Sequence, residues 1–481
     1  MARKLFITVH GIGDQRQFDS VQRVASQVLR VDSKNKYGPR LSLGKFASGA
    51  VAKATSHATA TAVHWHSPKT RILGFSEVHW ADLCRKPERE GFRLEPVVPW
   101  AQTLVDHVSM LKADSGNDQE EKAHEDKTDF ELIRAIIGEM GDGLHLIGWL
   151  TKLAPHLQLP TFEVDDIVNQ YLGDVQFVAE FSDIREQILE RFAETMEGVF
   201  QNAKLQDGDE IYLISHSEGT VVTLLGLLRA MRPQQKGNEP PSQAALKLAT
   251  DAMGSQNNGN DPLKENEPPA WLKHVRGWMT IGSPIDKHLI LWPDLFQDFE
   301  PGPNPKHLPP EPIPWWNYAD RGDPVGFERN SMRSWMKDHK WANNDSGKNA
   351  FQFGAESTAK DNDGNNENAK EIAFECVFSR YPWPGQAHLD YWNDNDLFDH
   401  FLCGVAGIGE SSQQEHYRQL AAPVLKDKWI PQFTSYAVPY LMAFFVLMMG
   451  VYFFDAGVWA ALGLKNENDL THFRTCPRTI S

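Results

Sequence analysis

One segment of the chain, residues 210–231, restricts the possible fold more than any other. Its first part, Glu210 to Ile214, is short and mostly apolar, which is typical of a strand buried inside a sheet. Its last part, Val221 to Met231, is apolar on nearly every side, as expected of a helix packed against such a sheet. Only the residues Ser-His-Ser-Glu-Gly at 215–219 separate the two, so the strand must turn sharply into the helix.

Further apolar runs have the same strand character, because β-branched and aromatic residues lie between turn residues: Leu5 to Val9, Phe75 to Trp80, Trp278 to Ile281, Trp315 to Tyr318 and Ile372 to Phe378. Between them, Asp183 to Phe200 carries apolar residues at helical spacing, with Asp183 and Glu186 as a predicted capping box. Strands that alternate with helices predict an α/β fold, with a mostly parallel sheet flanked by helices.

Three insertions interrupt this pattern. The region at about 100–170 contains an apolar stretch, Phe130 to Leu157, and is predicted to be a helical insertion that forms either a lid or additional core. The segments 234–270 and 343–370 are polar and rich in Asn and Asp, so they are predicted to be loops or disordered insertions.

The C-terminal part of the chain predicts a membrane segment. Residues 436–454 contain no charged side chain, and a helix of that length spans about 28 Å, close to the hydrocarbon thickness of a bilayer. We therefore divide the chain into an α/β domain at 1–405, a junction at 406–435, a transmembrane helix within 436–464 and a tail at 465–481. A buried C-terminal helix is the alternative.

Composition excludes several other classes of protein. The 481 residues include 64 acidic and 48 basic side chains, for a net charge of −16, and there is no basic run that would bind nucleic acid. The four cysteines are scattered, which excludes a disulfide framework and a thiolate zinc site: Cys84, Cys376, Cys403 and Cys476. The N-terminal apolar run is too short for a secretory signal, so a cytoplasmic start is expected.

The turn at 215–219 is a variant of the nucleophile-elbow motif G-x-S-x-G, with Ser215 in place of the first glycine. Small residues flank the nucleophile in this motif because strand and helix approach each other closely there. The N-terminus of the following helix directs free N–H groups and a positive dipole end toward Ser217. The alternative is an ordinary strand–helix turn capped by serine.

A serine nucleophile also needs a base for its proton and donors for a developing oxyanion. The first strand ends in His10-Gly11-Ile12, where the backbone N–H of Gly11 or Ile12 can join that of Glu218 as an oxyanion hole. We expect His10 to shape this turn rather than to act as the base. His64, His66 and His79 lack the ligand spacing of a metal site, so neither metal nor cofactor is expected.

Together with further motifs along the chain, these residues resemble the α/β-hydrolase superfamily, specifically its lipase-like and esterase-like serine hydrolases. The resemblance spans roughly residues 1–405 and is carried by an ordered set of motifs: His10-Gly11, Glu77 to Leu83, Tyr171 to Val175, Ser215 to Gly219, Thr280 to Pro284, Asn317 to Val325 and Ala387 to Trp392. It implies that the catalytic residues follow the chain order Ser, Asp, His.

Transferred to this sequence, the resemblance implies that Ser217 is the nucleophile. The acid falls on Asp323, with Asp320 as the competing residue; we favour Asp323 because a glycine before it and a proline after it suit a fixed turn. The base falls on His388, in the loop after the strand that ends at Phe378.

The expected function is therefore hydrolysis of acyl esters through an acyl-enzyme. The predicted membrane segment and the apolar insertion favour a lipid substrate, with the catalytic domain tied to a membrane on its cytoplasmic side. A peptidase or thioesterase would use the same residues. The alternative from another class is a catalytically degenerate, membrane-tethered interaction protein, which the departure at Ser215 favours.

Overall fold

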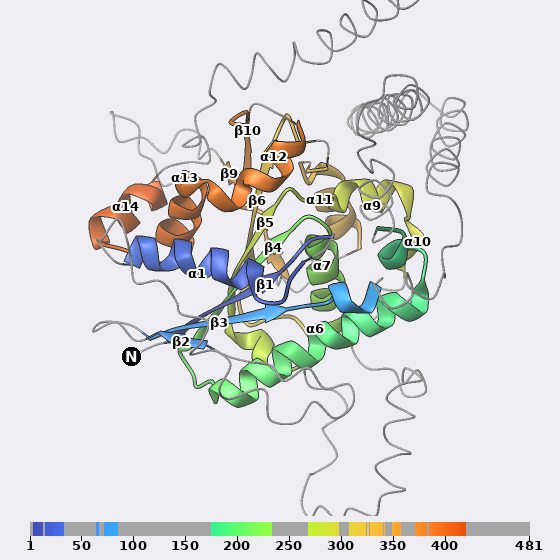
Figure 1. The fold of residues 1–481 in the computed structure, drawn as a ribbon, viewed down its shortest axis with the longest axis horizontal. Coiled ribbons are helices and arrows are strands. Elements are labelled where there is room, and N and C mark those ends of the chain that lie inside the picture. The colour runs from blue at the N-terminus through green and yellow to red at the C-terminus, as the bar shows by residue number, and fades with distance from the viewer. Residues whose placement is uncertain are drawn as a thin grey trace, which may run out of the picture.

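The computed structural model describes residues 3–12, 15–32, 64–66, 72–84, 175–232, 268–297, 307–323, 325–326, 328–339, 341, 349–356, 371–381 and 384–419 (Figure 1). The predicted insertion at 100–170, nearly all of the predicted loop at 234–270, the predicted membrane segment at 436–464 and the tail at 465–481 lie outside these ranges. Within the described ranges, no helix is both long enough and apolar enough to cross a bilayer.

Among the described residues, eight strands form one sheet, in which every pair of neighbours is parallel except β2 and β3. The order along the sheet is β10-β6-β5-β4-β1-β3-β2, with β7 beside the start of β6. The bounds are β1 Arg3–Val9, β2 His64–His66, β3 Ile72–Val78, β4 Glu210–His216, β5 Val275–Ile281, β6 Ile313–Asp320, β7 Phe351–Gln352 and β10 Glu375–Phe378. The predicted α/β class with a mostly parallel sheet is confirmed.

The direction of strand addition reverses at β1. The strand β3 pairs with one edge of β1, and the later strands β4, β5, β6 and β10 are added in this order from the other edge of β1. In open α/β sheets, ligands bind outside the carboxyl ends of the strands at such a reversal. The ends of β1 and β4, at His10 and Ser217, are therefore where a site is expected.

Helices cover both faces of the sheet, and each face has its own apolar core (Figure 1). The two cores share single strands: on β1, Leu5 and Ile7 belong to one core and Phe6 to the other, as the alternation of side chains in a strand requires. The first core is completed by α6 Ser182–Ala203, α7 Glu218–Ala230, η2 Ala270–His274, α9 Ile285–Leu291, α10 Asp294–Gln297 and α11 Asn330–Asp338.

The second core is completed by α1 Asp19–Asp32, α12 Pro384–Asp390, η3 Tyr391–Asn393, α13 Asn395–Asp399 and η4 His400–Val405. Helix α14, Ser411–Gln419, packs against η4 and lies within the predicted junction at 406–435.

Two predicted strand and loop boundaries are wrong. The run Ile372 to Phe378 is two strands in different sheets: β9, Glu371–Ala373, pairs with β8, Gly354–Glu356, whereas β10 joins the main sheet. The predicted polar loop at 343–370 accordingly contains β7 and β8. These strands form there because Phe351 and Phe353 are buried against the indole of Trp315.

The predicted capping box at Asp183 and Glu186 is also wrong. Helix α6 begins at Ser182, its N-cap is Phe181, and no side chain caps it. Asp183 therefore lies inside the first turn, and Glu186 pairs with Arg229 of α7 at 2.5 Å instead of folding back onto its own helix. Glu186 thus forms an ion pair between two helices instead of the predicted capping interaction within α6.

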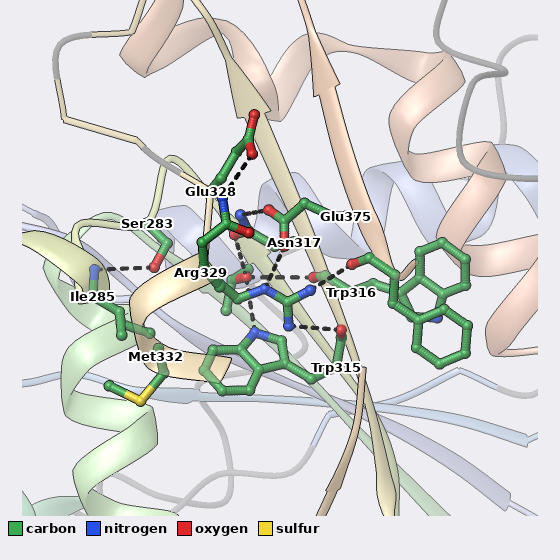
Figure 2. Close-up of polar contacts among 12 residues, drawn as sticks. Ser283, Ile285, Trp315, Trp316, Asn317, Glu328, Arg329, Met332 and Glu375 are labelled. Atoms are coloured by element: carbon green, nitrogen blue, oxygen red, sulfur yellow. Dashed lines mark hydrogen bonds and ion pairs between the residues drawn. The ribbon is translucent and has the colours of Figure 1, made fainter. Parts of the chain in front are cut away.

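A buried ion pair connects the last strands of the sheet (Figure 2). The Arg329 side chain donates to Glu375 Oε2 at 2.9 Å, to the Trp315 carbonyl at 2.8 Å and to the Phe374 carbonyl at 2.6 Å. Asn317 donates to the other oxygen of Glu375. Because an arginine cannot lose its proton, the carboxylate of Glu375 is the counterion that makes this burial tolerable. The pair fixes β6 against β10, and both strands lead into the candidate site.

We predict that Glu375→Gln lowers the free energy of unfolding by about 3–5 kcal/mol, because it leaves the buried guanidinium of Arg329 without a counterion. Urea unfolding at neutral pH measures this. Glu311→Gln, which removes the exposed partner of Arg276, is the matched control and should change nothing measurable. Equal stability of the two variants would contradict the assigned role of the pair.

Candidate active site

Ser217 lies at the tip of the turn between β4 and α7, in a backbone conformation that is rare for a residue with a side chain (φ 53°, ψ −134°). The turn is held by three hydrogen bonds: Ser217 N–H to the Ile281 carbonyl at 3.0 Å, and the N–H and Oγ1–H of Thr220 to the Ser217 carbonyl at 2.9 and 2.7 Å. The Ser217 hydroxyl is buried and forms no hydrogen bond with the described residues. A strained backbone that the surroundings hold in place is typical of a functional residue.

Glycines allow the loop after β1 to lie directly against this turn. A Cβ on Gly219 would be 2.3 Å from the His10 carbonyl oxygen, and a Cβ on Gly11 would be 2.6 Å from Ser217 Cβ. Neither position has room for a side chain. The predicted oxyanion-hole segment at Gly11 and Ile12 therefore lies beside Ser217, and Glu218 is the first residue of α7, where N–H groups have no partner within the helix.

His10 shapes this loop, as expected, because both of its ring nitrogens are engaged. Nδ1 donates to the Gly11 carbonyl at 2.7 Å, and Nε2 accepts the Trp80 backbone N–H at 3.0 Å. The indole N–H of Trp80 also donates to the His10 carbonyl, at 3.0 Å. The ring is therefore fixed and is not positioned as a base.

The Ser215 side chain, which departs from the motif, is accommodated in the sheet. It lies on β4 with its hydroxyl buried, and it accepts the indole N–H of Trp278 on the neighbouring strand β5 at 2.6 Å. Serine at this position therefore satisfies a buried donor without altering the turn.

His388 and Asp323 are in direct contact. Nδ1 of His388 lies 3.0 Å from both carboxylate oxygens of Asp323. The same carboxylate accepts the Val325 N–H and the Tyr391 hydroxyl, each at 2.8 Å. Burial by itself would raise the pKa of Asp323, but His388, Val325 and Tyr391 outweigh it and lower this pKa to about 2. The Asp323 carboxylate is therefore ionised throughout the physiological pH range.

Asp320 has a different environment from Asp323. Its carboxylate accepts backbone N–H groups from Gly322 at 2.8 Å, Arg380 at 2.6 Å and Tyr381 at 3.3 Å. Burial raises its pKa, although these donors oppose the shift. Asp323 thus contacts His388, whereas Asp320 links the turn after β6 to the segment after β10.

His216, which the sequence reasoning did not single out, connects the two halves of the site. It immediately precedes Ser217, and its ring centroid lies 4.7 Å from that of His388. Its Nε2–H donates to the His388 backbone carbonyl at 2.8 Å. Burial and the nearby imidazole of His388 lower the pKa of His216 to about 3, so it is neutral at physiological pH. No hydrogen bond links the Ser217 hydroxyl to His388, but such contacts are often formed only when substrate binds.

A second buried pair lies behind the turn. Glu218 Oε1 is 3.0 Å from His288 Nε2 on α9, although without hydrogen-bond geometry. His288 Nδ1 donates to the Pro284 carbonyl at 3.2 Å, which fixes its ring. The imidazole of His288 is thus held against the carboxylate of Glu218, the first residue of α7.

Comparison with family models, with curated proteins and with solved structures gives no match to this chain. Among the described residues, no group of three or more His, Cys, Asp or Glu side chains is arranged to hold a metal ion.

We predict a pH-dependent loss of stability in Asp323→Asn. Because the pKa of Asp323 falls from 3.8 to about 2 on folding, its charge stabilises the protein above about pH 4 by roughly 2 kcal/mol, and this contribution disappears as the pH falls toward 2. Urea unfolding of wild type and variant should differ more at pH 7 than at pH 3. A difference independent of pH would show that the Asp323 charge contributes nothing to stability.

Proposed function

We propose that this chain is a serine ester hydrolase of the α/β-hydrolase type, with Ser217 as nucleophile, His388 as general base and Asp323 as the acid. The observation that carries the proposal is the strained turn at Ser217 near the Asp323–His388 pair, at the carboxyl ends of the parallel strands β4, β6 and β10 of one sheet. The chain order Ser, Asp, His and the reversal of strand order at β1 agree with it.

The proposed mechanism begins with proton transfer from Ser217 to Nε2 of His388, since Nδ1 of that ring faces Asp323. The Ser217 oxygen attacks the ester carbonyl carbon, and a tetrahedral intermediate forms. Backbone N–H groups of the Gly11–Ile12 loop and of Glu218 stabilise its oxyanion. His388 returns the proton to the leaving alcohol, and water then hydrolyses the acyl-enzyme by the same steps.

Asp323 contributes by holding the tautomer in which His388 carries its proton on Nδ1, and by stabilising the imidazolium that forms. Its low pKa suits this role, because Asp323 stays charged throughout the physiological pH range. His216 is neutral and adjacent, so it adds no competing positive charge.

A lipid ester is the substrate class we propose. This part of the proposal depends on the sequence alone: the uncharged run at 436–454 would hold the enzyme at a bilayer, and the apolar stretch at 130–157 would cover or bind an acyl chain.

Ser217→Ala is expected to abolish hydrolysis of p-nitrophenyl esters and labelling by a fluorophosphonate probe, because the attacking oxygen is removed. Ser331→Ala, which alters another buried serine on α11, should be labelled like the wild type. Labelling that persists in Ser217→Ala would refute the nucleophile. A wild type that is neither labelled nor active would instead favour the catalytically degenerate interaction protein.

The lipid preference has its own test. The full-length chain should float with phospholipid vesicles and hydrolyse long-chain acyl esters with a higher kcat/KM than short, water-soluble ones. Preference for the short esters, together with no flotation, would contradict the lipid substrate but leave the esterase proposal intact.

A further inference from the structure

The environment of Asp323 includes a phenol that the proposed mechanism does not use. Tyr391 is completely buried, and its hydroxyl donates to Asp323 Oδ2 at 2.8 Å. The same phenol oxygen accepts the backbone N–H of Asp320 at 2.8 Å. Because that oxygen is already an acceptor for the Asp320 N–H, the hydroxyl proton is directed to Asp323.

The carboxylate is consequently held from three sides. Oδ1 accepts the Val325 N–H, Oδ2 accepts the Tyr391 hydroxyl, and Nδ1 of His388 lies equally far from both oxygens, at 3.0 Å. If the phenol were absent, the contact with His388 would be the remaining hydrogen-bond contact of Oδ2 within the described part of the chain. The phenol thus determines both the orientation of the carboxylate and how much negative charge His388 experiences.

His388 and Tyr391 are close together in the sequence, on consecutive helical segments. His388 lies in α12, and Tyr391 follows three residues later in η3, so consecutive helical turns present both side chains to one side. Gly282, at φ +57°, makes room for them: a Cβ there would be 3.0 Å from Asp323 Oδ2, from His388 Nδ1 and from the Tyr391 ring. The three groups therefore meet in one close-packed cluster.

Other charged or titratable groups near this cluster are few among the described residues. They are His216 at the end of β4, Asp320 at the end of β6, Tyr381 after β10, and Arg23 of α1, which acts on His216. None of them donates a hydrogen bond to the Asp323 carboxylate.

We propose that Tyr391 is a positioning residue of the hydrolase, acting through Asp323: it fixes the carboxylate against His388 and shares its negative charge. This inference rests on the proposed function. It differs from a purely structural role, because removing the phenol would alter the basicity of His388 as well as the packing.

Tyr391→Phe tests this with Tyr381→Phe as matched control. Tyr381 is also buried, its hydroxyl also donates to a carboxylate, Asp394 Oδ2 at 3.1 Å, and its ring contacts that of Tyr391, but it has no hydrogen bond to Asp323. In Tyr391→Phe, we expect kcat for p-nitrophenyl esters to fall roughly tenfold to a hundredfold with little change in KM, since a hydrogen bond to a charged group is lost. Tyr381→Phe should keep the wild-type kcat.

The pH profile separates positioning from packing. Without the phenol, more negative charge on Asp323 faces His388 and favours the imidazolium, so the acid limb of kcat/KM should move to higher pH in Tyr391→Phe. Incorporating 3-fluorotyrosine at position 391 preserves the hydroxyl and makes it a stronger donor, so the limb should move to lower pH. This second variant keeps the test valid if Tyr391→Phe does not fold.

The outcomes are distinct. A wild type without Ser217-dependent activity would refute the proposed function and this inference with it. An active wild type whose rate and pH profile are matched by both position-391 variants would refute the inference alone. Equal losses in Tyr391→Phe and Tyr381→Phe, without a shift of the acid limb, would reduce Tyr391 to a packing residue.

Discussion

The close approach between the β4–α7 turn and the loop after β1 is the constraint on which the candidate site depends. Gly219 meets the His10 carbonyl and Gly11 meets Ser217 at distances that exclude any side chain. Because the sheet neighbours on either side fix β1 and β4, the turn cannot relax away from this contact. The unusual backbone of Ser217 is maintained by that confinement and by its hydrogen bond to Ile281, and the hydroxyl is thereby directed to the end of the sheet.

The charge states of the buried groups are the second constraint on the site, because water cannot screen ionisable side chains there. Asp323 keeps its charge because three donors compensate for its burial. His216 is neutral, because burial and the adjacent His388 both disfavour its protonated form. The buried pair of Arg329 and Glu375 lies farther along the same strands, and it holds β6 and β10 together so that Asp323 and α12 are delivered side by side.

The parts of this arrangement that could be predicted from the sequence are those set by local pattern. The buried strands, the turn at Ser217 and the mostly parallel sheet follow from apolar runs and turn residues. The predictions that failed concern contacts between residues distant in the sequence: Glu186 pairs with Arg229 on another helix, and β8 pairs with β9 next to the buried side chains of Phe353 and Phe374. The choice between Asp323 and Asp320 needed the position of His388, and Tyr391 carried only one signal, its spacing of three from His388.

The serine at position 215, where the motif has glycine, is explained by a contact with the neighbouring strand β5. A glycine at this position would give the turn more freedom, but it would leave the indole N–H of Trp278 buried without its acceptor, which is costly inside a sheet. Trp278 in turn stacks on Trp315, with ring centroids 4.1 Å apart, and Trp315 carries the carbonyl that Arg329 binds. Ser215 is thus coupled through two tryptophans to the ion pair that holds β6. The departure from glycine at position 215 therefore has a structural explanation in the packing of the sheet.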